Sequence, residues 1–387
     1  MTEMVFGANP ARVTEPVLPR WWRTIDKLTL TLVFVLFGIG LLLGLAASVP
    51  LAADNNLEPF YYVRRQAGLG GIALVVMLGC SMLSPGTVRR LGVLGFGLAL
   101  IALLLLPLFG TDFGKGAVRW FSLGFTSVQP SEFLKPGFVI VAGWLIAAAQ
   151  DLNGPPGKTV SFVLMLVVVG FLAMQPDFGQ SALIIFAWGV IYFVGGAPMT
   201  LIVVVGALVV LAGLVFYQSS EHFARRIDGF LSPELDPRTQ LGYAANAIQE
   251  GGLFGVGVGE GQVKRSLPDA HTDFIIAVAA EEYGLILVLL ILLIYGVIVV
   301  RSLGRLLVER DPFVRLAGAG LACIFGVQAM INMGVAVRLL PAKGMTLPFI
   351  SYGGSSVIAA GITMGMLLAL TRVRPQGQIG DEFRRGR

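Results

Sequence analysis

The chain has 387 residues, of which 56% are hydrophobic and only 13% are charged. Soluble domains carry roughly a quarter charged residues, so the composition excludes an ordinary water-soluble core. The net charge of +5 does not indicate nucleic-acid binding, because the basic residues of a membrane protein first set its orientation. The composition therefore predicts an all-α polytopic membrane protein with no nucleic acid among its partners.

Apolar runs recur along the chain, and several reach the roughly 20 residues that cross a bilayer. They predict one bundle of about ten transmembrane helices within residues 28–371, with no separate domain. The predicted spans are 28–49, 68–82, 91–109, 133–149, 160–174, 181–194, 201–216, 275–300, 316–337 and 355–371. Residues 219–272, between the seventh and eighth spans, are predicted to form a large outer loop.

Two further patterns concern topology and packing. Short connections on one side of the predicted bundle are basic, with Arg89, Arg90 and Lys158 among them. The positive-inside rule therefore predicts cytoplasmic tails at residues 1–27 and 372–387. Glycines four residues apart, such as Gly361 and Gly365, predict helices in close contact.

The first outer segment with chemistry in it lies where the fourth span begins. A forked guanidinium and an ammonium there could grip phosphate oxygens, and interfacial snorkelling of Arg119 and Lys135 is the alternative. The candidate residues of this segment are Arg119, Trp120, Gln129, Ser131, Glu132 and Lys135.

The second and third segments each contribute an acid. Asp177 lies in a short turn, where it either caps a helix or faces the same polar cavity as the first segment. Asp273 opens a long apolar run, so we expect it at the mouth of the bundle with Lys264 and Arg265 within reach. The alternative for Asp273 is an interaction with the helix macrodipole.

The third segment also holds a glycine-rich run at residues 251–261 and two acids within the following span. The run is either a flexible turn or a loop whose backbone amides approach phosphate. Glu281 and Glu282 must each find a cation, water or the cavity, because charges at membrane depth need partners, and we expect each to form a structural ion pair with a cation. In the fourth segment, residues 338–356, irregular backbone at that depth predicts the lining of a cavity entrance.

Taken in order along the chain, these segments resemble the FtsW, RodA and SpoVE family. The stretch 343–348 is more similar to the division branch, FtsW, than to the elongation branch, RodA. The resemblance covers nearly the whole chain and rests on Arg119, Trp120, Gln129, Pro130, Ser131, Glu132, Gln175, Pro176, Asp177, Gly179, His271, Thr272, Asp273, Phe274, Glu281, Glu282, Asn332, Arg338, Pro341, Gly344, Ser351, Tyr352, Gly353 and Gly354.

The resemblance implies a peptidoglycan glycosyltransferase of the bacterial cytoplasmic membrane, acting at the division septum. Its implied substrates are lipid II and undecaprenyl-linked glycan, and its implied partners are a class B penicillin-binding protein and other division membrane proteins. It implies that Asp273 is the essential acid and adds Lys343, Ser351, Tyr352, Gly353 and Gly354 as substrate contacts.

The residues agree with what such chemistry requires. A carboxylate such as Asp273 can accept the proton of an attacking sugar hydroxyl. Direct displacement by that hydroxyl would invert the sugar carbon, by analogy with inverting glycosidases. Fixed cations must meet the pyrophosphate leaving group, and the candidates are Arg119, Lys135, Lys264 and Arg265. No motif demands a metal, which leaves open a divalent cation, Mg²⁺ or Mn²⁺, bound to pyrophosphate. An elongation-type polymerase, a lipid II flippase and a non-catalytic division scaffold remain as alternatives.

Overall fold

A computed structural model describes residues 16–112, 118–124, 126–151, 153–219, 221–232, 239–267, 269–341 and 344–373. The described chain is mainly helical, and its named strands form one two-stranded hairpin. Its elements are α1 (Val17–Thr24), α2 (Lys27–Asp54), α3 (Tyr61–Ser81), α4 (Pro85–Phe109), β1 (Phe121–Ser122), β2 (Ser127–Val128), α5 (Pro130–Ala148), α6 (Gly157–Met174), α7 (Phe178–Val194), α8 (Met199–Ser219), α9 (Glu221–Leu231), α10 (Gln240–Gly251), α11 (Val263–Ser266), α12 (Ile275–Leu307), α13 (Pro312–Ala336) and α14 (Gly354–Leu370).

The long helices match the predicted spans in number and order. Eight of them are long and apolar enough to cross a membrane, and α7 and α14 are shorter apolar helices of the same bundle. The expectation of about ten spanning helices is confirmed. The protein is a multi-pass membrane protein.

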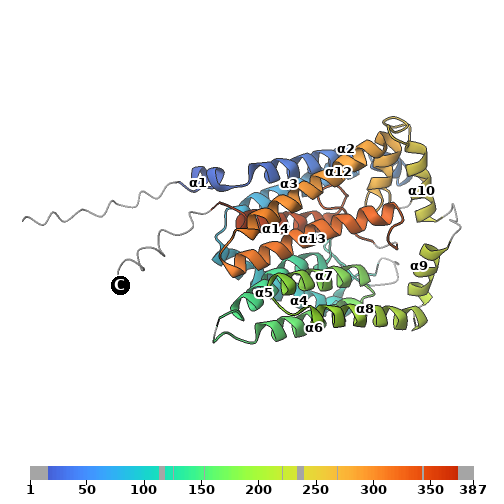
Figure 1. Cartoon of the computed structure of the whole chain (residues 1–387). Coiled ribbons are helices and arrows are strands. Elements are labelled where there is room, and N and C mark those ends of the chain that lie inside the picture. Colours follow the sequence, from blue (N-terminus) through green and yellow to red (C-terminus); the bar gives the residue numbers. More distant parts are fainter. Residues whose placement is uncertain are drawn as a thin grey trace, which may run out of the picture.

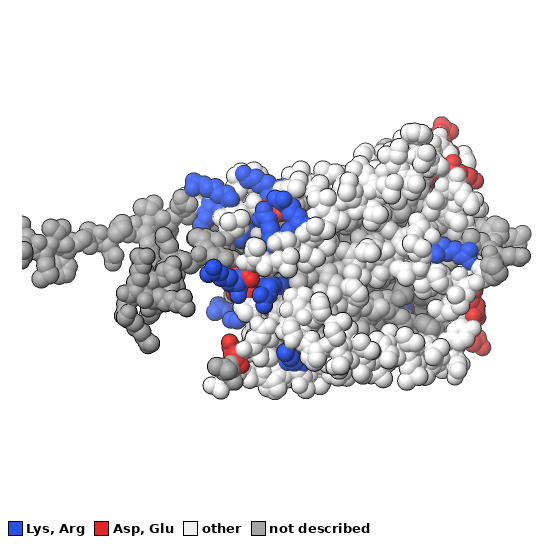
Figure 2. Space-filling view, viewed as in Figure 1, with Lys and Arg blue, Asp and Glu red and all other residues white. Residues whose placement is uncertain are grey.

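The two ends of the bundle differ in charge. The helices run side by side, with α1 and the end of α14 at one end and α9 and α10 at the other (Figure 1). Lysine and arginine side chains gather at the end that carries α1 (Figure 2). We call it the basic end, and it includes Arg301 and Arg305 near the end of α12. We call the opposite end, which carries α9 and α10, the loop end.

The helices α3 and α14 pack closely because small residues line their contact. A Cβ atom at Gly361 would lie 2.5 Å from the carbonyl oxygen of Ala73, and one at Gly365 would lie 2.6 Å from that of Met77. On α2, a Cβ at Gly40 would lie 2.6 Å from the carbonyl oxygen of Phe349. The predicted role of the glycine spacing in close helix contact is confirmed.

A buried aspartate ties the basic end together. The carboxylate of Asp26, at the N-cap of α2, accepts hydrogen bonds from the Nε atom of Arg301 at 2.9 and 2.7 Å. The Nε atom of Arg305 lies 3.1 Å away, and this arginine also donates to the carbonyl oxygen of Thr371 at 3.2 Å. Burial favours a raised pKa for Asp26, but the two arginines outweigh burial, and the pKa lies below its ordinary value. The aspartate thus joins α2, α12 and the end of α14.

The large loop predicted at residues 219–272, between the seventh and eighth spans, contains three helices in its described part, α9, α10 and α11. Of these, α10 carries apolar residues at helical spacing, including Tyr243, Ala244 and Ala247, and packs them against the bundle. The side chain of Thr239 caps its first turn, accepting from the amide of Gly242 at 3.1 Å. Helix α3 begins at Tyr61, earlier than the predicted span. Hydropathy missed this start because Arg64 and Arg65, in the first turns of the helix, lower the local hydropathy.

We predict that Gly361→Ala lowers the thermal unfolding temperature of the detergent-solubilised protein. Its methyl group would press on the α3 backbone, and such overpacking costs about 1–3 kcal/mol. The control is Gly71→Ala on α3, where a Cβ meets nothing within 4 Å. Equal unfolding temperatures for the two variants would contradict the packing argument.

Candidate functional site

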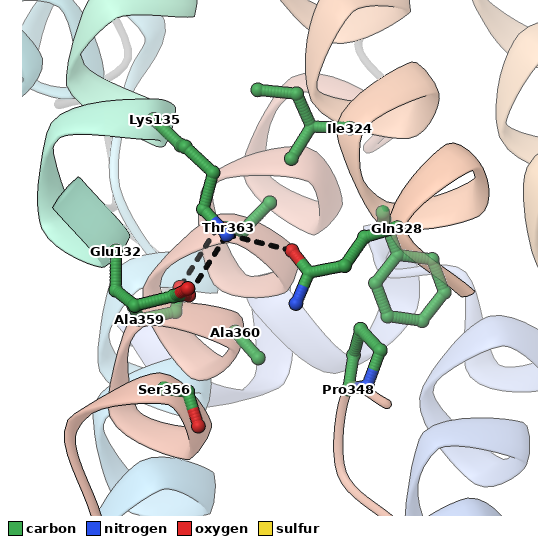
Figure 3. Close-up of a pocket in the computed structure, with 10 residues that line it drawn as sticks. Glu132, Lys135, Ile324, Gln328, Pro348, Ser356, Ala359, Ala360 and Thr363 are labelled. Carbon is green, nitrogen blue, oxygen red and sulfur yellow. Dashed lines mark hydrogen bonds and ion pairs between the residues drawn. The ribbon is translucent and has the colours of Figure 1, made fainter. Parts of the chain in front are cut away.

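A buried ion pair lies in the interior of the bundle. The Nζ atom of Lys135 lies 2.8 Å from a carboxylate oxygen of Glu132 and donates to Oε1 of Gln328 at 2.7 Å (Figure 3). The side chain of Gln180 donates to the other oxygen of Glu132 at 2.6 Å. We call Glu132, Lys135, Gln180 and Gln328 the ion-pair network.

The sequence explains how α5 presents this pair. Pro130 begins the helix at a position that needs no amide hydrogen. Glu132 and Lys135 are three residues apart and therefore share one face of α5, which points into the bundle. Lys135 is 2% exposed. The snorkelling alternative for this lysine is therefore wrong.

A small cavity adjoins the ion-pair network. Its volume is about 10 Å³, which is room for about one water molecule. The lining residues drawn in Figure 3 include Glu132, Lys135, Gln328, Pro348, Ser356 and Thr363. Pro348 and Ser356 both belong to the fourth predicted segment, which therefore lines this interior cavity. That the segment lines a cavity entrance stays a prediction.

The first and second predicted segments meet at the turn before α7. Arg119 donates through Nε to the carbonyl oxygen of Gln175 at 3.0 Å and through Nη2 to that of Pro176 at 2.8 Å. The carboxylate of Asp177 accepts from Nε2 of Gln129 at 3.2 Å and caps α7. Burial raises the pKa of Asp177, and the nearby charge of Arg119 offsets part of that shift. Asp177 therefore both caps a helix and belongs to the polar interior.

Asp273 lies at the loop end, where the third and fourth segments are joined through their backbones. The amide of Tyr352 donates to the carbonyl oxygen of His271 at 3.0 Å, and the hydroxyl of Ser351 donates to that of Thr272. A Cβ atom at Gly344 would lie only 3.2 Å from Oδ2 of Asp273. The carboxylate thus faces the backbone of the fourth segment at a position where a glycine leaves space.

Asp273 precedes the start of α12. The N-cap residue of this helix is Phe274, which makes no side-chain capping bond. Asp273 itself is only partly buried. Its position leaves the carboxylate at the mouth of the bundle, as the sequence predicts.

Two amides on α13 connect the ion-pair network with Asp273. Gln328 accepts from Lys135 and donates through Nε2 to the carbonyl oxygen of Thr346 at 2.9 Å. One turn later, Nδ2 of Asn332 donates to the carbonyl oxygens of Asp273, at 2.9 Å, and of Met345, at 2.6 Å. Gln328 thus links α5 to the carbonyl of Thr346, and Asn332 links the neighbouring carbonyl of Met345 to the backbone of Asp273.

The two predicted cations of the third segment, Lys264 and Arg265, differ in burial. Lys264 is buried, and its ammonium binds the carboxylate of Glu282 and the carbonyl oxygen of Gly259. The expected structural role of Glu282 as an ion-pair partner is confirmed. Arg265, the next residue, is exposed.

The remaining predicted site residues lie beside the hairpin, at the starts of α5 and α14, or outside the described residues. Trp120 pairs through its backbone with Thr111, beside the β1–β2 hairpin. Ser131 is buried in the first turn of α5, and a Cβ at Gly354 would lie 2.8 Å from the hydroxyl of Thr126. Lys343 lies outside the described residues.

Sequence reasoning missed the part played by the two amides of α13. Gln328 was not among the predicted residues, and Asn332 appeared only as the start of a family motif. Both are polar side chains within a long apolar run, and polar groups in spans mark functional positions. That signal could have found them.

We predict that Lys135→Met destabilises the protein by about 3–5 kcal/mol, because it leaves the buried carboxylate of Glu132 without its counter-ion. Chemical or thermal unfolding in detergent measures the loss. Lys158→Met, at the surface start of α6, is the control. Combining Lys135→Met with Glu132→Gln should recover most of the stability. A single variant as stable as the control would show that the pair is dispensable.

Comparisons with known proteins agree with this geometry. The family described as "Cell cycle protein", comprising FtsW, RodA and SpoVE, matches residues 26–376. The chain is 42% identical, over 94% of both chains, to a probable peptidoglycan glycosyltransferase FtsW of Caulobacter vibrioides, and 35% identical, over 93% of this chain and 95% of the relative, to that of Halorhodospira halophila.

Solved structures give the same result. A chain from a study of the structural coordination of polymerization and crosslinking by a peptidoglycan synthase complex has a TM-score of 0.74 at 29% identity, covering 91% of this chain and 99% of that one. The rod shape determining protein RodA of Thermus thermophilus has a TM-score of 0.68 at 28% identity, covering 92% and 99%. The predicted family is confirmed: the protein belongs to the FtsW/RodA/SpoVE family.

Proposed function

We propose that this protein is a peptidoglycan glycosyltransferase that polymerises lipid II at the outer face of the bacterial cytoplasmic membrane. Relatives at 42% and 35% identity carry that activity in their names. The structural observation that carries the proposal is the position of Asp273. Its backbone is held by Asn332, and its carboxylate faces Gly344 at the mouth of the bundle.

In the proposed reaction, Asp273 acts as general base. A hydroxyl oxygen of the acceptor sugar attacks the anomeric carbon of the donor, and its proton passes to the Asp273 carboxylate. The bond between that carbon and the pyrophosphate oxygen breaks, and undecaprenyl pyrophosphate leaves. This direct displacement inverts the sugar carbon and needs no covalent sugar–enzyme intermediate. A positioned base contributes about a hundred- to ten-thousandfold to such a step.

Cations are required where negative charge develops on the leaving group. Of the proposed residues, Arg119 fits this role best, because it is only partly buried and lies beside Asp177 at the polar turn before α7. The charges of Lys135 and Lys264 are already met by Glu132 and Glu282. Arg265 remains a second candidate because it is exposed.

A metal ion enters the proposal only as a companion of the substrate. Among the described residues, no group of three or more His, Cys, Asp or Glu side chains is arranged to hold a metal ion. A divalent cation, Mg²⁺ or Mn²⁺, would therefore arrive bound to pyrophosphate oxygens rather than to a cluster of these side chains.

We further propose that the protein acts at the division septum with a crosslinking partner. Its relatives bear the name FtsW, and the chain of highest TM-score given above comes from a complex that couples polymerization with crosslinking. A class B penicillin-binding protein of the FtsI type has the required transpeptidase chemistry. Other division membrane proteins would complete the assembly.

Three other functions compete with this one. An elongation-type polymerase would differ in its partner rather than in its chemistry. A lipid II flippase or a non-catalytic scaffold would form no glycosidic bond. Polymer formation from purified lipid II in detergent separates the polymerases from the last two.

We predict that Asp273→Asn polymerises lipid II at least roughly a hundredfold more slowly, since the amide cannot accept the proton. Asparagine keeps the size of the side chain, so stability should change by no more than about 1 kcal/mol. Gel analysis of glycan chains measures the rate. The control is Asp269→Asn in the same turn, where the positive φ of 57° suits asparagine. Near-normal synthesis by a folded Asp273→Asn protein would reject Asp273 as the base.

We predict that the loop end faces outward and that both termini are cytoplasmic. Gln240→Cys, at the start of α10, should react with a membrane-impermeant thiol reagent on intact spheroplasts. Arg310→Cys, between α12 and α13 at the basic end, should react only after permeabilisation. The opposite pattern would overturn the orientation and place Asp273 on the wrong side for the proposed reaction.

A further inference from the structure

Helix α12 begins shortly after Asp273 and is interrupted at Gly284. Gly284 has φ 78° and ψ 179°, a conformation that is nearly exclusive to glycine. In an unbroken helix the amides of Leu285 and Ile286 would donate to carbonyls four residues earlier. Here they donate to Gly252, at 3.0 Å, and to Leu253, at 3.4 Å. The glycine-rich loop thus supplies the acceptors that the helix lacks.

The same loop supplies the missing donors. The carbonyl oxygens of Glu281 and Glu282 would accept from Leu285 and Ile286 in a regular helix. They accept instead from the amide of Val256 at 2.9 Å and from that of Gly257 at 3.2 Å. Two helical hydrogen bonds are therefore replaced by four bonds to the loop, and every backbone group freed by the break at these positions has a partner. Such compensation permits a broken helix within a membrane bundle.

The contact is too close for any residue but glycine on either side. A Cβ atom at Gly284 would lie 2.2 Å from the carbonyl oxygen of Leu253. A Cβ atom at Gly255 would lie 2.2 Å from the carbonyl oxygen of Glu282, and one at Gly251 would lie 1.9 Å from that of Ala280. The glycine-rich run therefore serves close backbone contact with α12, and the amides of Val256 and Gly257 are not available to phosphate in this conformation.

A buried ion pair fixes the loop from its far side. The ammonium of Lys264, in α11, binds the carboxylate of Glu282, which is 1% exposed. The amide of Lys264 also donates to the carboxylate of Glu281 at 3.3 Å. We call residues 251–261 together with Lys264 the loop clamp.

We propose that the loop clamp positions Asp273 by holding the first part of α12 apart from the rest of the helix. Residues 275–283 form a short helix that directly follows Asp273, and the clamp fixes its end. The longer part of α12 runs to the basic end, where Arg301 binds Asp26. Gly255, Lys264 and Gly284 are thus positioning residues that act on the base through the short helix. This inference rests on the proposed function.

The test compares two glycines with positive φ, one inside the loop clamp and one outside it. Gly255→Ala and Gly196→Ala both place alanine at a positive φ, 80° and 70°, but a Cβ at Gly196, between α7 and α8, meets nothing within 4 Å. The purified full-length protein, in detergent, is assayed for polymerisation of lipid II, and hydrogen exchange is followed at the amides of Leu285 and Ile286. Gly284→Ala, with Gly296→Ala as its control on the same helix, repeats the comparison from the side of α12.

We expect Gly255→Ala to lower kcat roughly ten- to a hundredfold with little change in KM, because a base displaced by about 1 Å loses catalysis rather than binding. Exchange at Leu285 and Ile286 should accelerate in the same variant. Gly196→Ala should match the wild type in both measurements. A general loss of folding would instead lower the hydrogen-exchange protection of all amides. In that case the comparison of Gly284→Ala with Gly296→Ala tests the proposal.

The proposal fails if Gly255→Ala accelerates exchange at these amides yet polymerises like Gly196→Ala. It also fails if exchange is unchanged, or if KM rises while kcat is kept. A wild-type protein that forms no polymer would refute the proposed function instead, and the exchange measurement would still show whether the loop holds the break in α12.

Discussion

Polar groups inside this bundle must find partners within the protein, because lipid supplies none. In the described part of the chain, several side chains meet that constraint by donating to backbone carbonyls of irregular segments. Gln328 and Asn332 bind the carbonyls of Thr346 and Met345, and so fix a stretch of non-helical chain at membrane depth. That stretch faces the carboxylate of Asp273 through Gly344. The geometry of the candidate site is thus a consequence of satisfying buried hydrogen-bonding groups.

Charged side chains inside the bundle follow the same constraint and are paired within the protein. An unpaired charge at the centre of a membrane costs about 2.5–3.5 kcal/mol on insertion scales. Lys135 and Lys264 therefore carry carboxylate partners, Glu132 and Glu282. Because one pair lies in the bundle interior and the other beside the break in α12, each can orient a neighbouring segment without exposing charge to lipid. Arg119, which is partly exposed, bonds to backbone carbonyls instead and remains near the polar turn of Asp177.

The sequence alone predicted the class of fold, the number of spans and most of the residues around the mouth of the bundle. It could do so because hydropathy reports membrane depth and because motifs mark irregular backbone. It failed where the determining quantity is three-dimensional. Hydropathy could not assign Lys135 to a buried pair rather than the interface, since the i,i+3 spacing with Glu132 fits both. Nor could it separate phosphate binding from helix contact as the role of the glycines near Gly255, because both need close backbone approach.

The two ends of α12 explain why a membrane helix would carry a break at Gly284. At the basic end, Arg301 and Arg305 fasten the helix to the buried Asp26 and to the end of α14, so its long part cannot shift without breaking these ion pairs. A straight helix would transmit that fixed position directly to Asp273. With a break, the short helix can instead follow the segment that Asn332, Ser351 and Tyr352 hold, and the position of the base is set by its own surroundings. The glycine-rich loop stabilises the break, because it supplies partners for the amides of Leu285 and Ile286 and for the carbonyl oxygens of Glu281 and Glu282.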